Sequence, residues 1–310
     1  MRAMLIVNPH ATSTTERRRD ELTHALAGEM DLRVEHTLGR GHAAELAAKA
    51  AEDGVDLVVA HGGDGTVNEV ANGLLAGGLR PDIPALSIVP GGSTNVFARA
   101  IGVKPDPTAA TEQILATLAA HRRPRMVSLG KAGQRYFTFN AGMGIDAEVV
   151  RRVEEHRAAG GKISNRLHLS QALRAFRASD RKSGQLMITL PGDDPIVDCQ
   201  LAFVSNVDPW TYLGGRPIRT NPDTSPETGL GVFISRSLRL PTVLRAVGQL
   251  ARSKPGRGPH GRELVTADDV EWVRAAAPNG PVGVQADGDY LGEFDEVEFV
   301  SVPNALRVVV

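Results

Sequence analysis

Apolar residues in the first 123 positions fall into short runs that alternate with helical patterns. The runs predict four buried strands, over 3–7, 32–37, 56–60 and 85–90. Between them, the spacing of apolar positions predicts helices over 15–30, 43–53 and 67–75, and one more beginning near Thr94. Strands that alternate with helices in this way form a parallel sheet covered on both faces. Ligands bind such sheets beyond the carboxyl ends of the strands.

After Pro124 the pattern changes to short alternating or apolar runs separated by Gly, Pro and Asp. This pattern is typical of an antiparallel β-sandwich or barrel. Two helical stretches interrupt it, at 147–179 and 240–253. We therefore predict an α/β domain with a parallel sheet over 1–124, followed by an antiparallel β-sandwich domain with helical insertions over 125–304. The last strand, 305–310, is a candidate for returning to the first domain.

The composition argues against several classes of protein. With 35 Lys and Arg against 36 Asp and Glu, the formal net charge is -1, whereas nucleic-acid-binding proteins are usually basic. The single cysteine, Cys199, cannot form an internal disulfide. No segment has the length and polarity of a signal peptide or a transmembrane helix. These features lead us to expect a cytoplasmic protein.

The third predicted strand leads directly into the glycine-rich stretch HGGDGT, residues 61–66. Glycines allow close approach of another group, and the helix that follows directs free N–H groups into the turn. Together they predict a phosphate site. Asp64 would repel phosphates unless a divalent cation lies between them, or unless it orders the loop by accepting backbone N–H groups. Taken alone, the motif is more often a tight turn with a helix cap.

Three other strand ends carry similar small, polar turns. They read NPHATS (8–13), TLGRGHA (37–43) and PGGSTN (90–95). Because the carboxyl ends of adjacent parallel strands meet at one edge, the four turns are expected to converge there. The sequence therefore predicts a nucleotide-triphosphate site. It has neither the Gly-Lys-Ser/Thr of a P-loop nor the G-x-G-x-x-G of a dinucleotide fold after the first strand.

These motifs, with NAGMGIDAE (140–148) and VQADGDYLGE (284–293), resemble the diacylglycerol kinase catalytic-domain family in the same order along the chain. That family includes bacterial diacylglycerol kinases and the sphingosine and ceramide kinases. The resemblance implies an ATP-binding α/β domain, a β-sandwich domain that closes over it, and Mg²⁺-dependent transfer of the γ-phosphate to a lipid hydroxyl. The GGDGT element alone is shared with NAD kinases.

The resemblance also assigns site residues. Ser93 stands where the family's P-x-G-T-x-N pattern usually has threonine. The implied nucleotide-binding residues are Asn8, Thr12, Thr37, Gly62, Gly63, Asp64, Gly65, Thr66, Asn68, Glu69, Gly92, Ser93 and Asn95.

The catalytic residues implied by the resemblance are Asp289, Asp287 and Asp64. The family's base pattern is Asp-Gly-Glu, and here it reads Asp287-Gly288-Asp289. Asp289 occupies the base position with a side chain one methylene shorter than glutamate, so it must lie closer to the acceptor or act through water. An Asp-Gly pair also favours a hairpin turn, and both roles are compatible.

Two more acidic positions follow from the resemblance. Asp146 matches an acidic residue near the family's active site, and an N-cap for the next helix is an equally good interpretation. A structural Mg²⁺ site in the second domain is degenerate here, because its aspartates correspond to Thr228 and Gly231. Hard cations need several oxygen ligands, so the site either survives through carbonyls or is absent. Its remaining candidate ligands are Ser225, Thr228 and Leu230.

A lipid acceptor requires contact with a membrane surface. Residues 233–262 contain no Asp or Glu but seven Lys or Arg, and apolar residues within 240–250 recur at helical spacing. This segment is interpreted either as a basic helix on an anionic membrane or as an ordinary helix packed on the sheet. Trp210 and Tyr212 line an acyl pocket if exposed, although buried aromatics are the commoner case.

The sequence-based prediction is an ATP- and Mg²⁺-dependent lipid kinase, with diacylglycerol as the leading acceptor. It is expected to work in the cytoplasm, peripherally bound to the inner face of the membrane, without nucleic acid and with a homodimer left open. The alternatives are an NAD kinase and a non-catalytic nucleotide or lipid sensor with the same fold.

Overall fold

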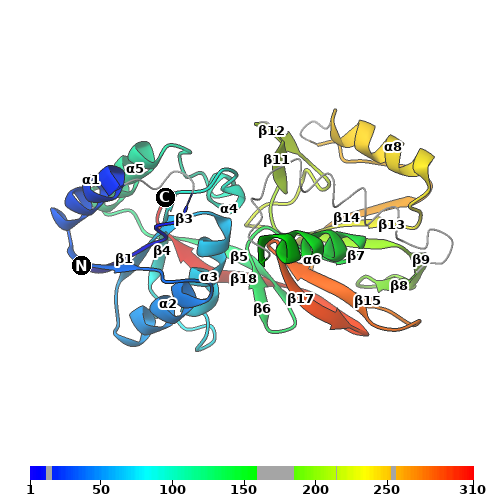
Figure 1. The fold of residues 1–310 in the computed structure, drawn as a ribbon, viewed down its shortest axis with the longest axis horizontal. Coiled ribbons are helices and arrows are strands. Elements are labelled where there is room, and N and C mark those ends of the chain that lie inside the picture. Colours follow the sequence, from blue (N-terminus) through cyan, green and yellow to red (C-terminus); the bar gives the residue numbers. More distant parts are fainter. Residues whose placement is uncertain (12–15, 159–184, 214, 253–255) are drawn as a thin grey trace. The chain divides into compact units, whose positions relative to one another are not determined.

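The computed structural model describes residues 1–11, 16–158, 185–213, 215–252 and 256–310. The chain divides into two compact units, which are shown in Figure 1. The first unit comprises residues 1–129 and 303–310, and the second comprises residues 130–302. Among the helices in the described ranges, none combines the length and apolar character needed to span a membrane.

The first unit is built on a parallel sheet with the strand order β2-β1-β3-β4-β18. Every residue of β3 and β4 is buried, as expected for central parallel strands covered on both faces. In this sheet the carboxyl ends of β1, β2, β3 and β4 all face one edge. The strands are β1 (Arg2–Val7), β2 (Asp31–His36), β3 (Leu57–Gly62), β4 (Ala85–Pro90) and β18 (Glu296–Val308).

Helices cover both faces of this sheet. Figure 1 shows α1 and α5 on one face and α2 and α3 on the other. Leu22, Leu26 and Ile114 from α1 and α5 join the apolar side chains of the strands in one core. On the opposite face α2 and α3 lie so close that a Cβ at Gly73 would come within 2.2 Å of the Ala44 carbonyl oxygen. The helices are α1 (Glu16–Ala27), α2 (His42–Glu52), α3 (Asp64–Leu74), α4 (Val96–Ala100) and α5 (Pro107–Ala119).

The second unit contains two antiparallel sheets. One has the order β14-β13-β10-β7-β16-β17, and the other runs from β18 through β15 and β8 to β9. Apolar side chains from both sheets share one core, including Val232 from the first and Phe299 from the second. This arrangement is the predicted antiparallel β-sandwich. Of the remaining strands, β5 pairs with both β6 and β18, and β11 and β12 form a hairpin.

Strand β5 (Arg125–Ala132) begins in the first unit and ends in the second. The other strands of the second unit have the following bounds: β6 (Arg135–Phe137), β7 (Asn140–Gly144), β8 (Leu186–Thr189), β9 (Ile196–Cys199), β10 (Leu201–Ser205), β11 (Thr211–Leu213), β12 (Arg216–Ile218), β13 (Leu230–Ser235), β14 (Leu264–Val270), β15 (Trp272–Ala276), β16 (Val282–Ala286) and β17 (Asp289–Phe294). Strand β18 contributes to both units, because its first part pairs with β15 and Val308 pairs with Leu86 of β4. The chain's last strand therefore does reach the first sheet.

The helices differ from the predicted ones at their ends. Helix α3 begins at Asp64, because Gly63 in extended conformation already serves as the N-cap. Helix α6 (Ile145–Ala158) covers the start of the predicted 147–179 stretch, and residues 159–179 lie outside the described part. Helix α8 (Leu240–Leu250) confirms the other predicted helical insertion. The pattern gave no separate prediction for α5.

Candidate active site

The turn after β3 exposes the amino end of α3. Gly63 is the N-cap, with φ -87° and ψ -176°, and no side chain caps the helix. A Cβ at Gly62 would lie 2.6 Å from the Thr66 hydroxyl oxygen, so this position requires glycine. At Gly65 a Cβ would meet no atom within 4 Å, which leaves open space beside the first turn. Backbone N–H groups and the helix dipole make such a terminus favourable for an anion.

The turn after β4 packs against this first turn, backbone to backbone. The Gly91 N–H donates to the Gly62 carbonyl at 2.7 Å. A Cβ at Gly91 would lie 2.9 Å from the Gly62 Cα, and one at Gly92 would lie 2.8 Å from the Gly63 Cα. Side chains at these positions would therefore force the two turns apart. The glycines of GGDG and PGGS are needed for this approach as well as for any ligand.

Asn95 fixes the shape of the second turn. Its backbone is left-handed, with φ 49°, a conformation that asparagine tolerates better than most residues. The side-chain oxygen accepts from the Gly92 N–H at 3.0 Å, and the amide group donates to the Gly92 carbonyl at 2.7 Å. The neighbouring Ser93 is exposed.

The turn after β1 is tied to the same place. The Asn8 side-chain amide donates to the Thr66 hydroxyl at 3.0 Å, and the Asn8 backbone N–H donates to the His61 carbonyl at 2.9 Å. The Asn8 side-chain oxygen accepts from the His10 N–H at 3.0 Å. Thr12, which the resemblance also assigned to the nucleotide, lies outside the described residues.

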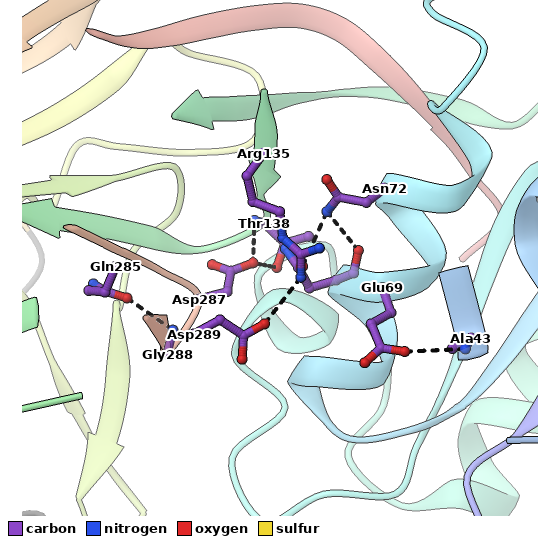
Figure 2. Close-up of polar contacts among 10 residues, drawn as sticks. Ala43, Glu69, Asn72, Arg135, Thr138, Gln285, Asp287, Gly288 and Asp289 are labelled. Carbon is purple, nitrogen blue, oxygen red and sulfur yellow. Dashed lines mark hydrogen bonds and ion pairs between the residues drawn. The ribbon is translucent and has the colours of Figure 1, made fainter. Parts of the chain in front are cut away.

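The turn after β2 completes the set. Buried Thr37 continues the sheet through its N–H, which donates to the Val7 carbonyl at 2.9 Å. At the start of α2, the Ala43 N–H donates to the Glu69 carboxylate at 3.2 Å (Figure 2). One turn further along α3, the Asn72 side chain donates to both oxygens of Asn68, at 2.9 and 3.1 Å. The four turns predicted to converge do lie together.

Most of the predicted polar side chains in these turns hold the turns in place. Asn8, Thr66, Asn68, Glu69 and Asn95 each have a hydrogen-bonding partner within the first unit. What the site presents to a ligand is mainly backbone N–H groups, with the exposed Ser93 and the half-buried Asp64 beside them. Such a cradle fits a chain of phosphates.

A second cluster of polar residues surrounds the turn between β16 and β17. Asp287 and Gly288 have φ values of 50° and 80°, and Ala286 pairs with Asp289, so the two residues form a type I′ hairpin turn.

The buried Asp287 carboxylate accepts four hydrogen bonds of 2.6 to 3.0 Å, from the Thr138 N–H and hydroxyl and from the N–H groups of Phe139 and Asn140. Burial raises the pKa of Asp287, and these bonds oppose that rise. Asp287 therefore organises the turn.

Asp289 is the more accessible of the two aspartates. Its side chain is 23% exposed, and one carboxylate oxygen pairs with the Arg135 guanidinium at 3.1 Å, as Figure 2 shows. Arg135 comes from β6, and the sequence analysis did not identify it. The ion pair fixes the orientation of a carboxylate that the hairpin turn has already placed. This geometry suits a positioned proton acceptor.

Asp146 is linked to the same turn through Gln285. The Gln285 amide group donates to Asp146 at 2.7 Å and to the Asn140 side chain at 3.0 Å, and its oxygen accepts from the Gly288 N–H at 3.0 Å. The Asp146 carboxylate points inward over Gly142, where a Cβ would lie only 2.6 Å from it. This enclosure raises the pKa of Asp146 to about 6. Gln285, like Arg135, was missed from sequence.

At the degenerate metal site, the residues of the loop bind one another. The Thr228 hydroxyl accepts from the Ser225 N–H at 2.9 Å and lies 3.0 Å from the Ser225 carbonyl, to which it donates. A Cβ at Gly231 would lie 2.1 Å from the Thr224 hydroxyl, so no aspartate fits there. In the described part of the chain, no group of three or more His, Cys, Asp or Glu could hold a metal ion. Ser225, Thr228 and Leu230 stay a prediction as metal ligands, and the Ser225 and Thr228 groups bind each other in this structure.

Trp210 and Tyr212 are both half-buried. Trp210 packs edge-on against Phe203, with ring centroids 5.0 Å apart. The Trp210 ring therefore packs within the second unit.

Comparisons with known proteins show a family to which the first unit is similar. Residues 2–127 match the model of the diacylglycerol kinase catalytic domain. The chain is 41% identical over 120 residues to a probable lipid kinase YegS-like protein of Chromohalobacter salexigens, which covers 38% of this chain and 36% of that protein. It is 36% identical over 149 residues to a diacylglycerol kinase of Bacillus subtilis, which covers 46% of each. The matches thus span less than half of these curated relatives.

Solved structures extend the likeness of fold over almost the whole chain. A candidate diacylglycerol kinase from Bacillus anthracis superposes with a TM-score of 0.76 at 23% identity, over 99% of this chain and 96% of that one. Yeast NADH kinase superposes with a TM-score of 0.51 at 11% identity, over 99% and 82% of the two chains. At these identities the likeness shows a shared fold and nothing of substrate.

Proposed function

Residues 2–127 match the model of the diacylglycerol kinase catalytic domain, and on this premise we propose that the chain is an ATP-dependent lipid kinase. The kinase class is supported by the family match and by the relatives named diacylglycerol kinase. ATP as the donor and diacylglycerol as the acceptor, with phosphatidic acid as the product, are the finer parts of the proposal. The protein would then act as a peripheral protein at the inner face of the cytoplasmic membrane.

One observation carries the proposal, namely the packing of the two glycine turns against each other at the carboxyl edge of the first sheet. The Gly91–Gly62 hydrogen bond of 2.7 Å and the uncapped start of α3 bring N–H groups from neighbouring turns together. Phosphoryl transfer depends mostly on holding the phosphates and offsetting their charge. Asp64 is the carboxylate that would hold Mg²⁺ here, and that ion would supply charge neutralisation when bound with the nucleotide.

In the proposed reaction, Asp289 is the general base. It accepts the proton of the lipid hydroxyl while that oxygen forms a bond to the γ-phosphorus. The bond from this phosphorus to the oxygen bridging to the β-phosphate breaks, and ADP leaves. Arg135 orients the Asp289 carboxylate, and Asp287 holds the turn that carries it. Asp287 is thus a positioning residue rather than a second proton acceptor.

The proposal is tested with the purified chain, radiolabelled ATP, Mg²⁺ and a panel of acceptors in detergent micelles. The panel contains diacylglycerol, monoacylglycerol, sphingosine, ceramide and, in solution, NAD. We expect label in phosphatidic acid. Label in NADP alone would replace the proposal with the NAD kinase alternative. ATP binding without label in any acceptor would favour the non-catalytic sensor.

A further inference from the structure

Helix α8 turns an apolar face outward. Leu240, Leu244 and Val247 are spaced i, i+4 and i+7, so they share one face, and their exposed fractions are 54%, 61% and 55%. No residue of α8 is buried. A surface helix of a soluble protein normally packs its apolar stripe against the core. Here the most apolar stripe faces away from the second unit.

Basic residues surround this face. Arg245 and Arg252 are exposed and, among the described residues, form no ion pair. With Arg257 and His260 they line a groove of about 560 Å³ beside the helix. The segment from Phe233 to Arg262 contains no Asp or Glu. A groove lined by three guanidinium groups favours phosphate, which arginine binds in a bidentate manner.

The position of this groove is fixed by contacts within the second unit. The Gln249 side chain of α8 donates to the His260 carbonyl at 3.0 Å and accepts from the His260 N–H at 2.8 Å. These two bonds hold the loop that carries Arg257 and His260 against the helix. The apolar face and the basic groove therefore form one surface.

The charge of this surface selects its partner. A second copy of the chain packed on α8 through a two-fold axis would bring the same arginines together, which is unfavourable. An anionic bilayer is complementary to both parts of this surface, since its acyl chains can contact the apolar face and its headgroup phosphates can bind the arginines.

We propose that α8 and the adjoining 256–262 loop form a docking surface for anionic phospholipid bilayers. Leu240, Leu244 and Val247 enter the headgroup–acyl boundary, and Arg245, Arg252 and Arg257 bind phosphates. This inference deepens the proposed function by giving the lipid kinase its route to a membrane, and it rests on that function for its purpose. The binding itself is measured without ATP or diacylglycerol, so it stands or fails separately from phosphoryl transfer.

The test is co-sedimentation with vesicles of phosphatidylcholine alone and of phosphatidylcholine mixed with phosphatidylglycerol. Val247→Asp is compared with Leu79→Asp, because Leu79 is exposed to the same extent, 54% against 55%, on a loop of the first unit. We expect Val247→Asp to weaken binding to anionic vesicles by about tenfold or more and Leu79→Asp to leave it unchanged. All variants should keep the melting temperature of the wild type, since the substituted positions are exposed.

The contribution of the arginines is tested with a double variant, Arg245→Gln combined with Arg252→Gln. Its vesicle binding is compared with that of Arg122→Gln, a control at an exposed position of the first unit. Each α8 arginine should account for roughly a fivefold change in affinity, and added salt should reduce it. Equal binding to neutral and anionic vesicles, or wild-type binding by Val247→Asp, would overturn the proposal. So would a dimer in sedimentation equilibrium that Val247→Asp dissociates while vesicle binding persists.

Discussion

The candidate site of the first unit presents backbone groups, whereas that of the second unit presents a side chain. In the first unit, side chains such as Asn8, Glu69 and Asn95 hold turns, and the backbone is what remains to meet a ligand. In the second unit, the backbone of the hairpin turn is held by the buried Asp287, and a side chain, Asp289, is presented. Phosphates need many fixed donors, whereas proton transfer needs one group in one place. The difference follows from these two tasks.

The largest expected effect separates the two aspartates of the second unit. Asp289→Asn removes the proton acceptor while keeping its shape, and we expect turnover to fall by about a hundredfold or more with little change in melting temperature. Asp287→Asn replaces a buried carboxylate that accepts four hydrogen bonds, so it should lower the free energy of unfolding by about 2–4 kcal/mol. Radiometric assays and urea unfolding of both variants measure this.

We expect turnover to fall mainly in Asp289→Asn and stability to fall mainly in Asp287→Asn. Wild-type turnover in folded Asp289→Asn would remove the base assignment. An Asp287→Asn variant that is as stable as the wild type would show that the turn does not depend on its carboxylate.

Asp146 gives the second unit a pH dependence. Enclosure raises the pKa of Asp146 from 3.8 to about 6, so the folded state binds this proton more tightly than the unfolded state. The stabilisation from protonated Asp146 is complete below about pH 4 and is lost as the pH rises to about 6. The difference corresponds to roughly 2–3 kcal/mol. Asp146→Asn should therefore be more stable than the wild type at pH 7.

Urea unfolding from pH 4 to pH 7 measures this difference. The wild type should lose stability relative to Asp146→Asn as the pH increases, and the two should converge near pH 4. Parallel profiles across this range would contradict the assignment.

In the first unit, substitutions at two glycines distinguish the packing of the turns from the binding of the nucleotide. At Gly92 a Cβ would lie 2.8 Å from the Gly63 Cα, so Gly92→Ala should cost about 1–3 kcal/mol of stability by forcing the turns apart. At Gly65 a Cβ meets only open space, so Gly65→Ala should fold normally and raise the KM for ATP by about tenfold. Thermal unfolding with and without ATP, together with ATP kinetics, distinguishes the two. Equal KM values for Gly65→Ala and wild type would place the nucleotide elsewhere.

The alternation of apolar runs was sufficient to predict the parallel sheet and the β-sandwich, because buried strands and amphipathic helices leave strong periodic signals. The convergence of the four turns also followed, since parallel strands direct their carboxyl ends to one edge. Helix α5 was missed although Asp106 caps it and Pro107 occupies its first turn. That pair is a recognisable helix start, and it was available in the sequence.

What sequence could not supply was the pairing of polar groups between distant segments. Arg135 reaches Asp289 across 154 positions, and Gln285 reaches Asp146 across 139. Nothing near Arg135 in the chain marks it as different from other surface arginines. For the same reason, the motif alone did not show that Asn95 and Glu69 hold the turns through their own side chains.

The smallest effect is predicted for the loop at 224–231, where the resemblance implied a metal site. Its Thr228 hydroxyl bridges the Ser225 N–H and carbonyl, and its ends are held by Asp268 and Asp269 from β14. Thr228→Val removes the hydroxyl at constant volume and should cost about 1 kcal/mol. Because these groups bind one another, we expect a chelator to leave the melting temperature of the nucleotide-free protein unchanged. A fall in melting temperature with chelator, restored by Mg²⁺ in the wild type but not in Thr228→Val, would mean that the loop does bind a metal and that Thr228 is one of its ligands.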